Sequence, residues 1–185
     1  MEINLRASVT AGIVLAAGAG SRYGQPKAPV VIDGERLVDR AVRVLQDAGC
    51  FPIAVVLGAW IGDVPGAIVV ENADWASGMG SSLREGLTWA QSTDADSVIV
   101  TLVDLPGLTA DAVTRIVENP ADLVSATFDG QRGHPVKFGR AHWAALIESA
   151  SGDMGARDYL RTRDDLVLVE VSDIADGQDL DTPIA

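Results

Sequence analysis

Short apolar runs alternate with amphipathic segments along the chain, and this alternation limits the possible folds more than any other feature of the sequence. The apolar runs at residues 11–17, 53–57 and 97–103 are typical of strands that are covered on both faces. Between such runs, apolar residues recur every three or four positions, as in residues 37–48, which predicts helices. Strands that alternate with helices build a mostly parallel sheet flanked by helices. We therefore predict a single α/β domain that spans residues 1–185.

The same two patterns predict the remaining elements. Strands are expected at residues 67–70 and 166–171, and a hairpin-like pair of strands at residues 123–128 and 135–138. A capping-box pattern predicts that a helix begins at Ser82, and a second predicted helix has Thr109 as its N-cap. The predicted helices after residue 80 are 82–91, 109–118, 141–150 and 156–163.

The net charge excludes two classes of partner. The chain has 26 acidic residues against 14 basic ones, which gives a formal net charge of −12. Such a balance does not favour a nucleic-acid backbone or an anionic membrane surface. No apolar run approaches the roughly 18 to 20 residues that a membrane-spanning helix needs. We therefore expect neither nucleic acid nor a membrane as a partner.

The single cysteine, Cys50, indicates a reducing compartment, because one cysteine cannot form an internal disulfide. It stands directly before an apolar run, so we interpret it as a small core side chain rather than a catalytic thiol. Residues 1–10 contain no apolar stretch of the secretory type. We therefore expect a cytoplasmic protein.

A glycine-rich loop follows the first predicted strand, at residues 18–27. Gly18, Gly20 and Gly24 allow the backbone N–H groups to turn toward a ligand, as phosphate oxygens require. Arg22 and Lys27 add two cations, and Lys27 is one of only two lysines in the chain. The spacing matches neither a dinucleotide fingerprint nor a Walker loop. The loop therefore predicts an anion site of another type, with a flexible surface loop as the alternative.

Acidic residues provide two candidate metal-binding positions. Asp104 directly follows the predicted strand 97–103, where a carboxylate could meet a divalent cation that bridges phosphates, although it could also begin a turn before Pro106. The second position is the segment Asp179–Pro183, for which the alternative is a solvated acidic tail. The four tryptophans fall on different elements, and we interpret them as packing residues.

Six segments in this order resemble the signature of the MobA-like nucleotidyltransferases of the molybdenum cofactor family. They span nearly the whole chain and read LAAGAGSRYGQPK (15–27), NADWASGMGSSL (72–83), DLP (104–106), RGHP (132–135), GDMGAR (152–157) and DLDTP (179–183). The resemblance implies a three-layer Rossmann-like domain of the nucleotide-diphospho-sugar transferase type. Ala17 stands where the guanylyl branch typically has glycine, so the resemblance favours the cytidylyltransferase-like branch.

The resemblance also implies a reaction: CTP and molybdopterin would give a molybdopterin dinucleotide and pyrophosphate, with a molybdoenzyme or its chaperone as a possible protein partner. Lys27 and Arg22 would hold the phosphates and act in catalysis together with Asp104, while Asp104 and Asp181 would bind Mg²⁺. His134, Asp153 and Arg157 would lie on the acceptor side, although His134 before a proline could equally be structural. The implied nucleotide-binding residues are Leu15, Ala16, Ala17, Gly18, Gly20, Gly78, Met79, Ser81 and Ser82.

Two other functions are compatible with these residues. Relatives in this branch include proteins assigned as nicotine blue oxidoreductase, which implies NADPH or NADH as the cofactor in place of Mg²⁺. The third possibility is a nucleotide-binding protein that delivers cofactor without turnover. The chain also departs from the family at Leu105, where glutamine is common.

Overall fold

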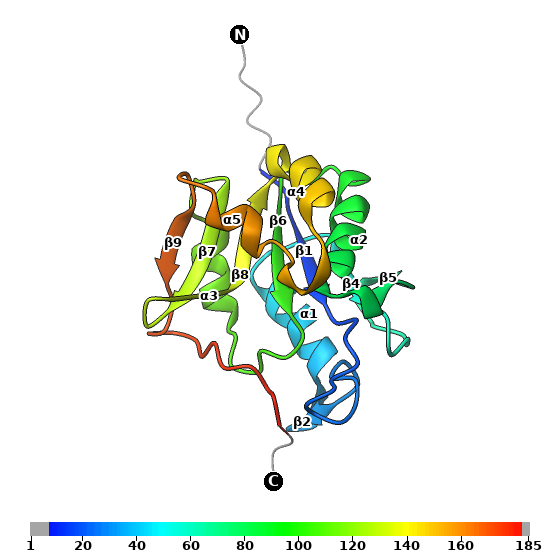
Figure 1. Cartoon of the computed structure of the whole chain (residues 1–185). Coiled ribbons are helices and arrows are strands. Elements are labelled where there is room, and N and C mark those ends of the chain that lie inside the picture. Colours follow the sequence, from blue (N-terminus) through cyan, green and yellow to red (C-terminus); the bar gives the residue numbers. More distant parts are fainter. Residues whose placement is uncertain (1–7, 183–185) are drawn as a thin grey trace.

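A computed structural model describes residues 8–182 of the chain, and its central feature is a seven-stranded mixed sheet (Figure 1). The strand order in this sheet is β5-β4-β1-β6-β8-β7-β9, and every neighbouring pair is parallel except the two that involve β8. A separate small hairpin pairs β2 with β3. The strands are β1 (Thr10–Leu15), β2 (Val31–Ile32), β3 (Glu35–Arg36), β4 (Ile53–Leu57), β5 (Ile68–Glu71), β6 (Ser97–Leu102), β7 (Leu123–Phe128), β8 (Gln131–Gly139) and β9 (Val167–Glu170).

Helices cover both faces of the sheet, so the predicted three-layer α/β architecture is confirmed. Side chains alternate across β1: Ile13 and Leu15 join the core beneath α2, α4 and α5, whereas Val14 joins the core beneath α1 and α3. Both cores are apolar, which explains why the central strands read as continuous apolar runs. The helices are α1 (Leu37–Asp47), α2 (Met79–Gln91), α3 (Ala110–Val117), α4 (Trp143–Ser149) and α5 (Arg157–Arg161).

Most predicted elements form, and the differences have local causes. Thr109 caps α3 as predicted, because its hydroxyl accepts a hydrogen bond from the Ala112 N–H. The capping box at Ser82 is wrong: α2 begins at Met79, and its N-cap is Gly78 at φ +115°, which makes no side-chain cap. The hairpin of β2 and β3 was not predicted, since its strands have only two residues each.

Two further expectations concern Cys50 and membranes. Cys50 is buried in the core, as predicted, and burial raises the pKa of its thiol to about 12. Within residues 8–182, no helix is both long enough and apolar enough to cross a bilayer.

The C-terminal segment returns to the edge of the sheet where β1 and β6 end (Figure 1). It leaves β9 at one side of the sheet and passes beneath the ends of the central strands. Three hydrogen bonds hold it there: Thr109 Oγ1 donates to the Ile174 carbonyl, the Asp176 N–H to Gly107, and the Leu180 N–H to Asp104. The order of the strands thus brings residues 104 and 179–181 together although they are distant in sequence.

Candidate functional site

The loop after β1 has backbone N–H groups that find no partner within the described part of the chain. Between residues 8 and 182 there is no acceptor for the N–H groups of residues 18–21. The turn is closed by the Gly24 N–H, which donates to the Gly20 carbonyl at 2.7 Å. Gly20 has φ +63°, and a Cβ there would lie 1.9 Å from the Gln25 carbonyl oxygen. The loop therefore requires glycine at position 20, and its free N–H groups can bind an anion.

Beside this loop, the four charged residues singled out from the sequence form one cluster. Lys27 Nζ lies 2.7 Å from Asp104 Oδ2 and 3.7 Å from Asp181 Oδ1. Arg22 reaches the same Asp181 carboxylate at 3.7 Å. The Lys27 and Asp104 side chains are largely buried, whereas Arg22 is exposed. The structure thus brings together groups from three segments that are widely separated in the sequence.

A third carboxylate lies near this cluster. Burial and the negative charges of Asp104 and Asp181 raise the pKa of Asp179, against the opposing effect of Lys27. Three carboxylates therefore lie near the Lys27 ammonium group, and an added cation would relieve the repulsion between them. Pro183, the last residue of the predicted motif, lies outside the described residues.

The donor set fits a divalent cation only if the substrate completes the coordination. Among residues 8–182 no group of three or more His, Cys, Asp or Glu side chains is arranged to hold a metal ion. Asp104 and Asp181 supply carboxylate oxygens, and Mg²⁺ is commonly held by one or two carboxylates together with substrate phosphates. The free N–H groups of the loop lie beside them and would hold those phosphates. The residues therefore fit a metal that arrives with a nucleotide.

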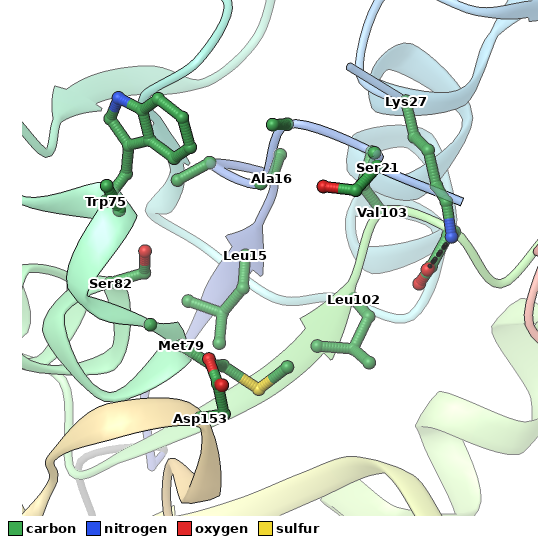
Figure 2. A pocket seen from close by; sticks show the side chains of 17 residues that line it. Leu15, Ala16, Ser21, Lys27, Trp75, Met79, Ser82, Leu102, Val103 and Asp153 are labelled. Carbon is green, nitrogen blue, oxygen red and sulfur yellow. Dashed lines mark hydrogen bonds and ion pairs between the residues drawn. The ribbon is translucent and has the colours of Figure 1, made fainter. Parts of the chain in front are cut away.

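A cavity of about 340 Å³ extends from Lys27 along the loop to α2 (Figure 2). Nearly all of the predicted nucleotide-binding residues line it: Leu15, Ala16, Ala17, Gly18, Gly20, Gly78, Met79 and Ser82. Lys27 lies at one side, while Trp75 and Ser82 lie at the opposite side. Trp75, which the sequence indicated only as a packing residue, therefore borders the cavity. Its ring packs on Gly58, where a Cβ would lie 2.5 Å from Trp75 Cβ.

Ser81 differs from its expected place, because its side chain does not line this cavity. Its hydroxyl faces the carbonyls of Asp74 and Gly78, at 3.0 and 2.9 Å. Asn72 belongs to the recognised segment, but the sequence did not assign it a role. Its amide contacts the hydroxyls of both Ser81 and Ser82 in the buried space behind the cavity.

A second cavity, of about 540 Å³, adjoins the first one. Leu15, Met79, Leu102 and Asp153 line both cavities, so the two spaces lie side by side. His134 and Arg157, both predicted on the acceptor side, line the second cavity together with Arg132. Arg132 lies in the RGHP segment, although the sequence did not indicate a role for it.

His134 is uncharged at neutral pH. Burial lowers the pKa of its imidazole to about 4; Asp104 opposes this shift and Arg157 adds to it. The positive charge in the second cavity therefore comes from arginines, and His134 can offer one hydrogen-bond donor and one acceptor.

Comparison with known proteins gives matches over nearly the full chain. Residues 12–167 match the model of the MobA-like NTP transferase domain. The chain is 38% identical to nicotine blue oxidoreductase of Paenarthrobacter nicotinovorans, over 92% of this chain and 91% of that protein. It is 31% identical to a molybdenum cofactor guanylyltransferase of Rhizobium johnstonii, over 94% of this chain and 82% of that protein.

Solved structures share the fold. Rv0371c of Mycobacterium tuberculosis H37Rv superposes with a TM-score of 0.78 at 24% identity, covering 96% of this chain and 95% of that one. A structure of the same protein in complex with manganese has a TM-score of 0.69 at 22% identity, with 89% of each chain covered. A structure named as a glucose-1-phosphate thymidylyltransferase of Bacillus anthracis also superposes, with a TM-score of 0.74 at 15% identity, covering 94% of this chain and 91% of that one. The fold is therefore of the nucleotide-diphospho-sugar transferase type.

Proposed function

The chain belongs to the MobA-like NTP transferase domain family and is a nucleotidyltransferase of that family, and we propose that it transfers the cytidylyl group of CTP to the phosphate of molybdopterin. The observation that carries the proposal is the convergence of the free N–H groups of residues 18–21 with Lys27, Asp104 and Asp181 beside one elongated cavity. Ala17, where the guanylyl branch typically has glycine, supports a cytidine nucleotide.

The proposed binding mode follows the charge distribution. The triphosphate lies on the N–H groups of the loop, with Lys27 and Arg22 neutralising its oxygens, and the base extends toward Trp75. The acceptor lies in the second cavity, where Arg132 and Arg157 hold its anionic group. Because the two cavities share lining residues, an acceptor in the second cavity would have its phosphate near the α-phosphorus of CTP.

In the proposed reaction, an oxygen of the molybdopterin phosphate forms a bond to the α-phosphorus of CTP. The bond from that phosphorus to the oxygen bridging the α- and β-phosphates breaks, and pyrophosphate leaves with the electron pair. Phosphoryl transfer depends mainly on positioning and on neutralising charge, which Lys27, Arg22 and the loop N–H groups provide. A Mg²⁺ ion held by Asp104 and Asp181 would supply further neutralisation of the triphosphate. A protein of the same fold, Rv0371c, forms a complex with manganese, which supports a divalent ion as the metal.

The test incubates the protein with molybdopterin, Mg²⁺ and each nucleoside triphosphate in turn, and measures pyrophosphate. We expect release with CTP that stops when the metal is chelated. Release with GTP in place of CTP would change the assigned base, and no release with any of the four nucleotides would reject nucleotidyl transfer to molybdopterin.

A second candidate function is favoured by the 38% identity to nicotine blue oxidoreductase. In that case the loop would hold the pyrophosphate of NADPH or NADH, which would donate hydride to a quinone pigment. Oxidation of NADPH or NADH by nicotine blue that is insensitive to chelation would support this function. The two candidate functions thus differ in both the co-substrate and the requirement for metal.

A further inference from the structure

Asn72 lies behind the wall of the nucleotide cavity and is 3% exposed, so its amide must be satisfied by the protein. Its Oδ1 accepts a hydrogen bond from the Asp74 N–H at 2.9 Å. Because a backbone N–H can only donate, this contact fixes which end of the amide is the oxygen. The Nδ2 group therefore faces Ser81 and Ser82, at 2.8 and 3.0 Å.

Both hydrogens of Asn72 Nδ2 are used, and both serine hydroxyls consequently accept. The Ser81 hydroxyl donates its own hydrogen bond to the carbonyl of Asp74 or of Gly78. The Ser82 hydroxyl has no such acceptor anywhere in residues 8–182. Ser82 is 5% exposed and lines the cavity, so its proton is available to a ligand rather than to bulk water.

The position of Ser82 indicates which part of a nucleotide it meets. Lys27 and the loop N–H groups bind phosphates at one side of the cavity, and Ser82 lies at the other side with Trp75 (Figure 2). A nucleotide with its phosphates on the loop therefore places its base near Ser82. Because this hydroxyl already accepts a hydrogen bond from Asn72 and its own proton is free, it suits a hydrogen-bond acceptor on the base, such as O2 or N3 of cytosine.

We infer that Asn72 is a positioning residue that holds the Ser82 hydroxyl as a hydrogen-bond donor to the acceptor edge of the base. The inference rests on the proposed function for the identity of the nucleotide. Asn72 itself does not touch the ligand. It sets the direction of the Ser82 hydrogen bond and thereby contributes to the choice of base.

The test measures the dissociation constants of CTP and of ribose 5′-triphosphate, which lacks the base, for three forms of the protein. Ser82→Ala removes the donor, and we expect CTP to bind about tenfold more weakly, as the loss of one hydrogen bond implies. Asn72→Asp keeps the acceptor for the Asp74 N–H but replaces Nδ2 by a carboxylate oxygen. The Ser82 hydroxyl would then donate to the introduced carboxylate and present lone pairs to the base, so the loss for CTP should be at least as large.

Ribose 5′-triphosphate is expected to bind all three forms alike, because its phosphates do not contact Ser82. Ser97→Ala is the matched control, since it removes another buried serine hydroxyl, which pairs with Thr10 at 2.9 Å near the start of the strands. This control should leave both constants unchanged. Circular dichroism of each variant checks that the fold persists.

The outcomes separate the inference from the proposed function. Equal losses for both ligands, or no loss for CTP in Ser82→Ala, would overturn the inference while leaving CTP as the substrate. Unchanged CTP affinity in folded Asn72→Asp would show that Ser82 acts without Asn72, which also overturns it. Failure of the wild-type protein to bind CTP would reject both the proposed nucleotide and the inference.

Discussion

Glu170 ends β9 and Asp179 follows it in the C-terminal segment, and the protein surrounds these two carboxylates with opposite kinds of groups. Glu170 accepts hydrogen bonds from the hydroxyls of Ser172 and Thr127 and from three backbone N–H groups, those of Asp129, Gly130 and Ser172. These donors, with the Ser172 hydroxyl contributing most, lower the pKa of Glu170 to about 2. Asp179 instead lies near Asp104 and Asp181, and its pKa is raised.

The difference separates a carboxylate that the protein satisfies from carboxylates that we propose to be functional. Glu170 ties the turn between β7 and β8 to the end of β9, so its charge is fully satisfied within the protein. The three carboxylates near Lys27 outnumber the two cations there, Lys27 and Arg22, and leave oxygens for a ligand. Loss of a structural carboxylate should therefore lower stability and spare the chemistry, whereas loss of a functional one should do the reverse.

The largest expected effect is on catalysis. Asp104→Asn removes the carboxylate 2.7 Å from Lys27, and we expect pyrophosphate release to fall by at least about a hundredfold, as when a group that stabilises transition-state charge is removed. The Tm should change less than in Glu170→Gln, because Lys27 keeps Asp181 as a partner. Near-normal activity would remove Asp104 from the mechanism and show that it is not a functional carboxylate.

The next effect is on nucleotide binding. Gly20→Ala places a Cβ 1.9 Å from the Gln25 carbonyl at φ +63°, so the loop must distort and CTP should bind at least about tenfold more weakly. Gly34→Ala is the control, since it also substitutes a glycine at positive φ, +84°, but its Cβ would contact nothing. Titration calorimetry with both variants distinguishes loop geometry from general strain; equal losses would contradict the prediction.

A smaller effect is expected on stability. Glu170→Gln puts an amide group among hydrogen-bond donors, and the Tm at pH 7 should fall by a few degrees while pyrophosphate release stays within a few-fold of wild type. Because the folded pKa is below the ordinary value of 4.5, the contribution of Glu170 is complete above about pH 4.5 and lost as pH falls toward 2.

Thermal unfolding between pH 2.5 and 7 measures this dependence. The difference in Tm between wild type and Glu170→Gln should shrink as the pH is lowered. The exposed carboxylate of Glu148 on α4 provides the control variant Glu148→Gln, for which we expect little change. A difference that is constant with pH would mean that the charge of Glu170 has no role.

The smallest effect has the opposite sign. The raised pKa of Asp179 means that its ionisation opposes folding, so its contribution is most favourable below its ordinary pKa of 3.8 and declines as the pH rises through the higher folded value. Asp179→Asn should therefore raise the Tm by about 1–2 °C at pH 7 and leave it unchanged near pH 3. A lower Tm at pH 7 would place Asp179 with Glu170 as a structural residue.

Much of the fold was predictable, because apolar periodicity reports burial directly. The strands and helices lie close to their predicted places, and Thr109 caps its helix through a bond within its own first turn. The start of α2 was mispredicted for a tertiary reason. A Cβ on Gly78 would lie 2.4 Å from the Gly152 carbonyl carbon, so the helix entry is shaped by a segment far away in the sequence.

The site residues also divide into those that the sequence predicted and those whose place depends on tertiary contacts. Family motifs selected Lys27, Asp104 and Asp181, and the structure brings their side chains together. The motifs did not show that Ser81 points away from the cavity, or that Trp75 borders it. Both facts depend on contacts across elements: Asn72 orients the two serines, and Gly58 leaves space for the Trp75 ring.

The alternation of strands and helices, the glycines of the loop after the first strand and the chemical types of the site residues could all be read from the sequence, because they follow from neighbouring residues and from local backbone preferences. Seven acidic residues follow residue 163, but the sequence does not show which of them have a lowered pKa and which a raised one. That Glu170 meets five donors while Asp179 meets two other carboxylates depends on the folded chain, because the electrostatic environment of a side chain is set by the residues that folding brings beside it.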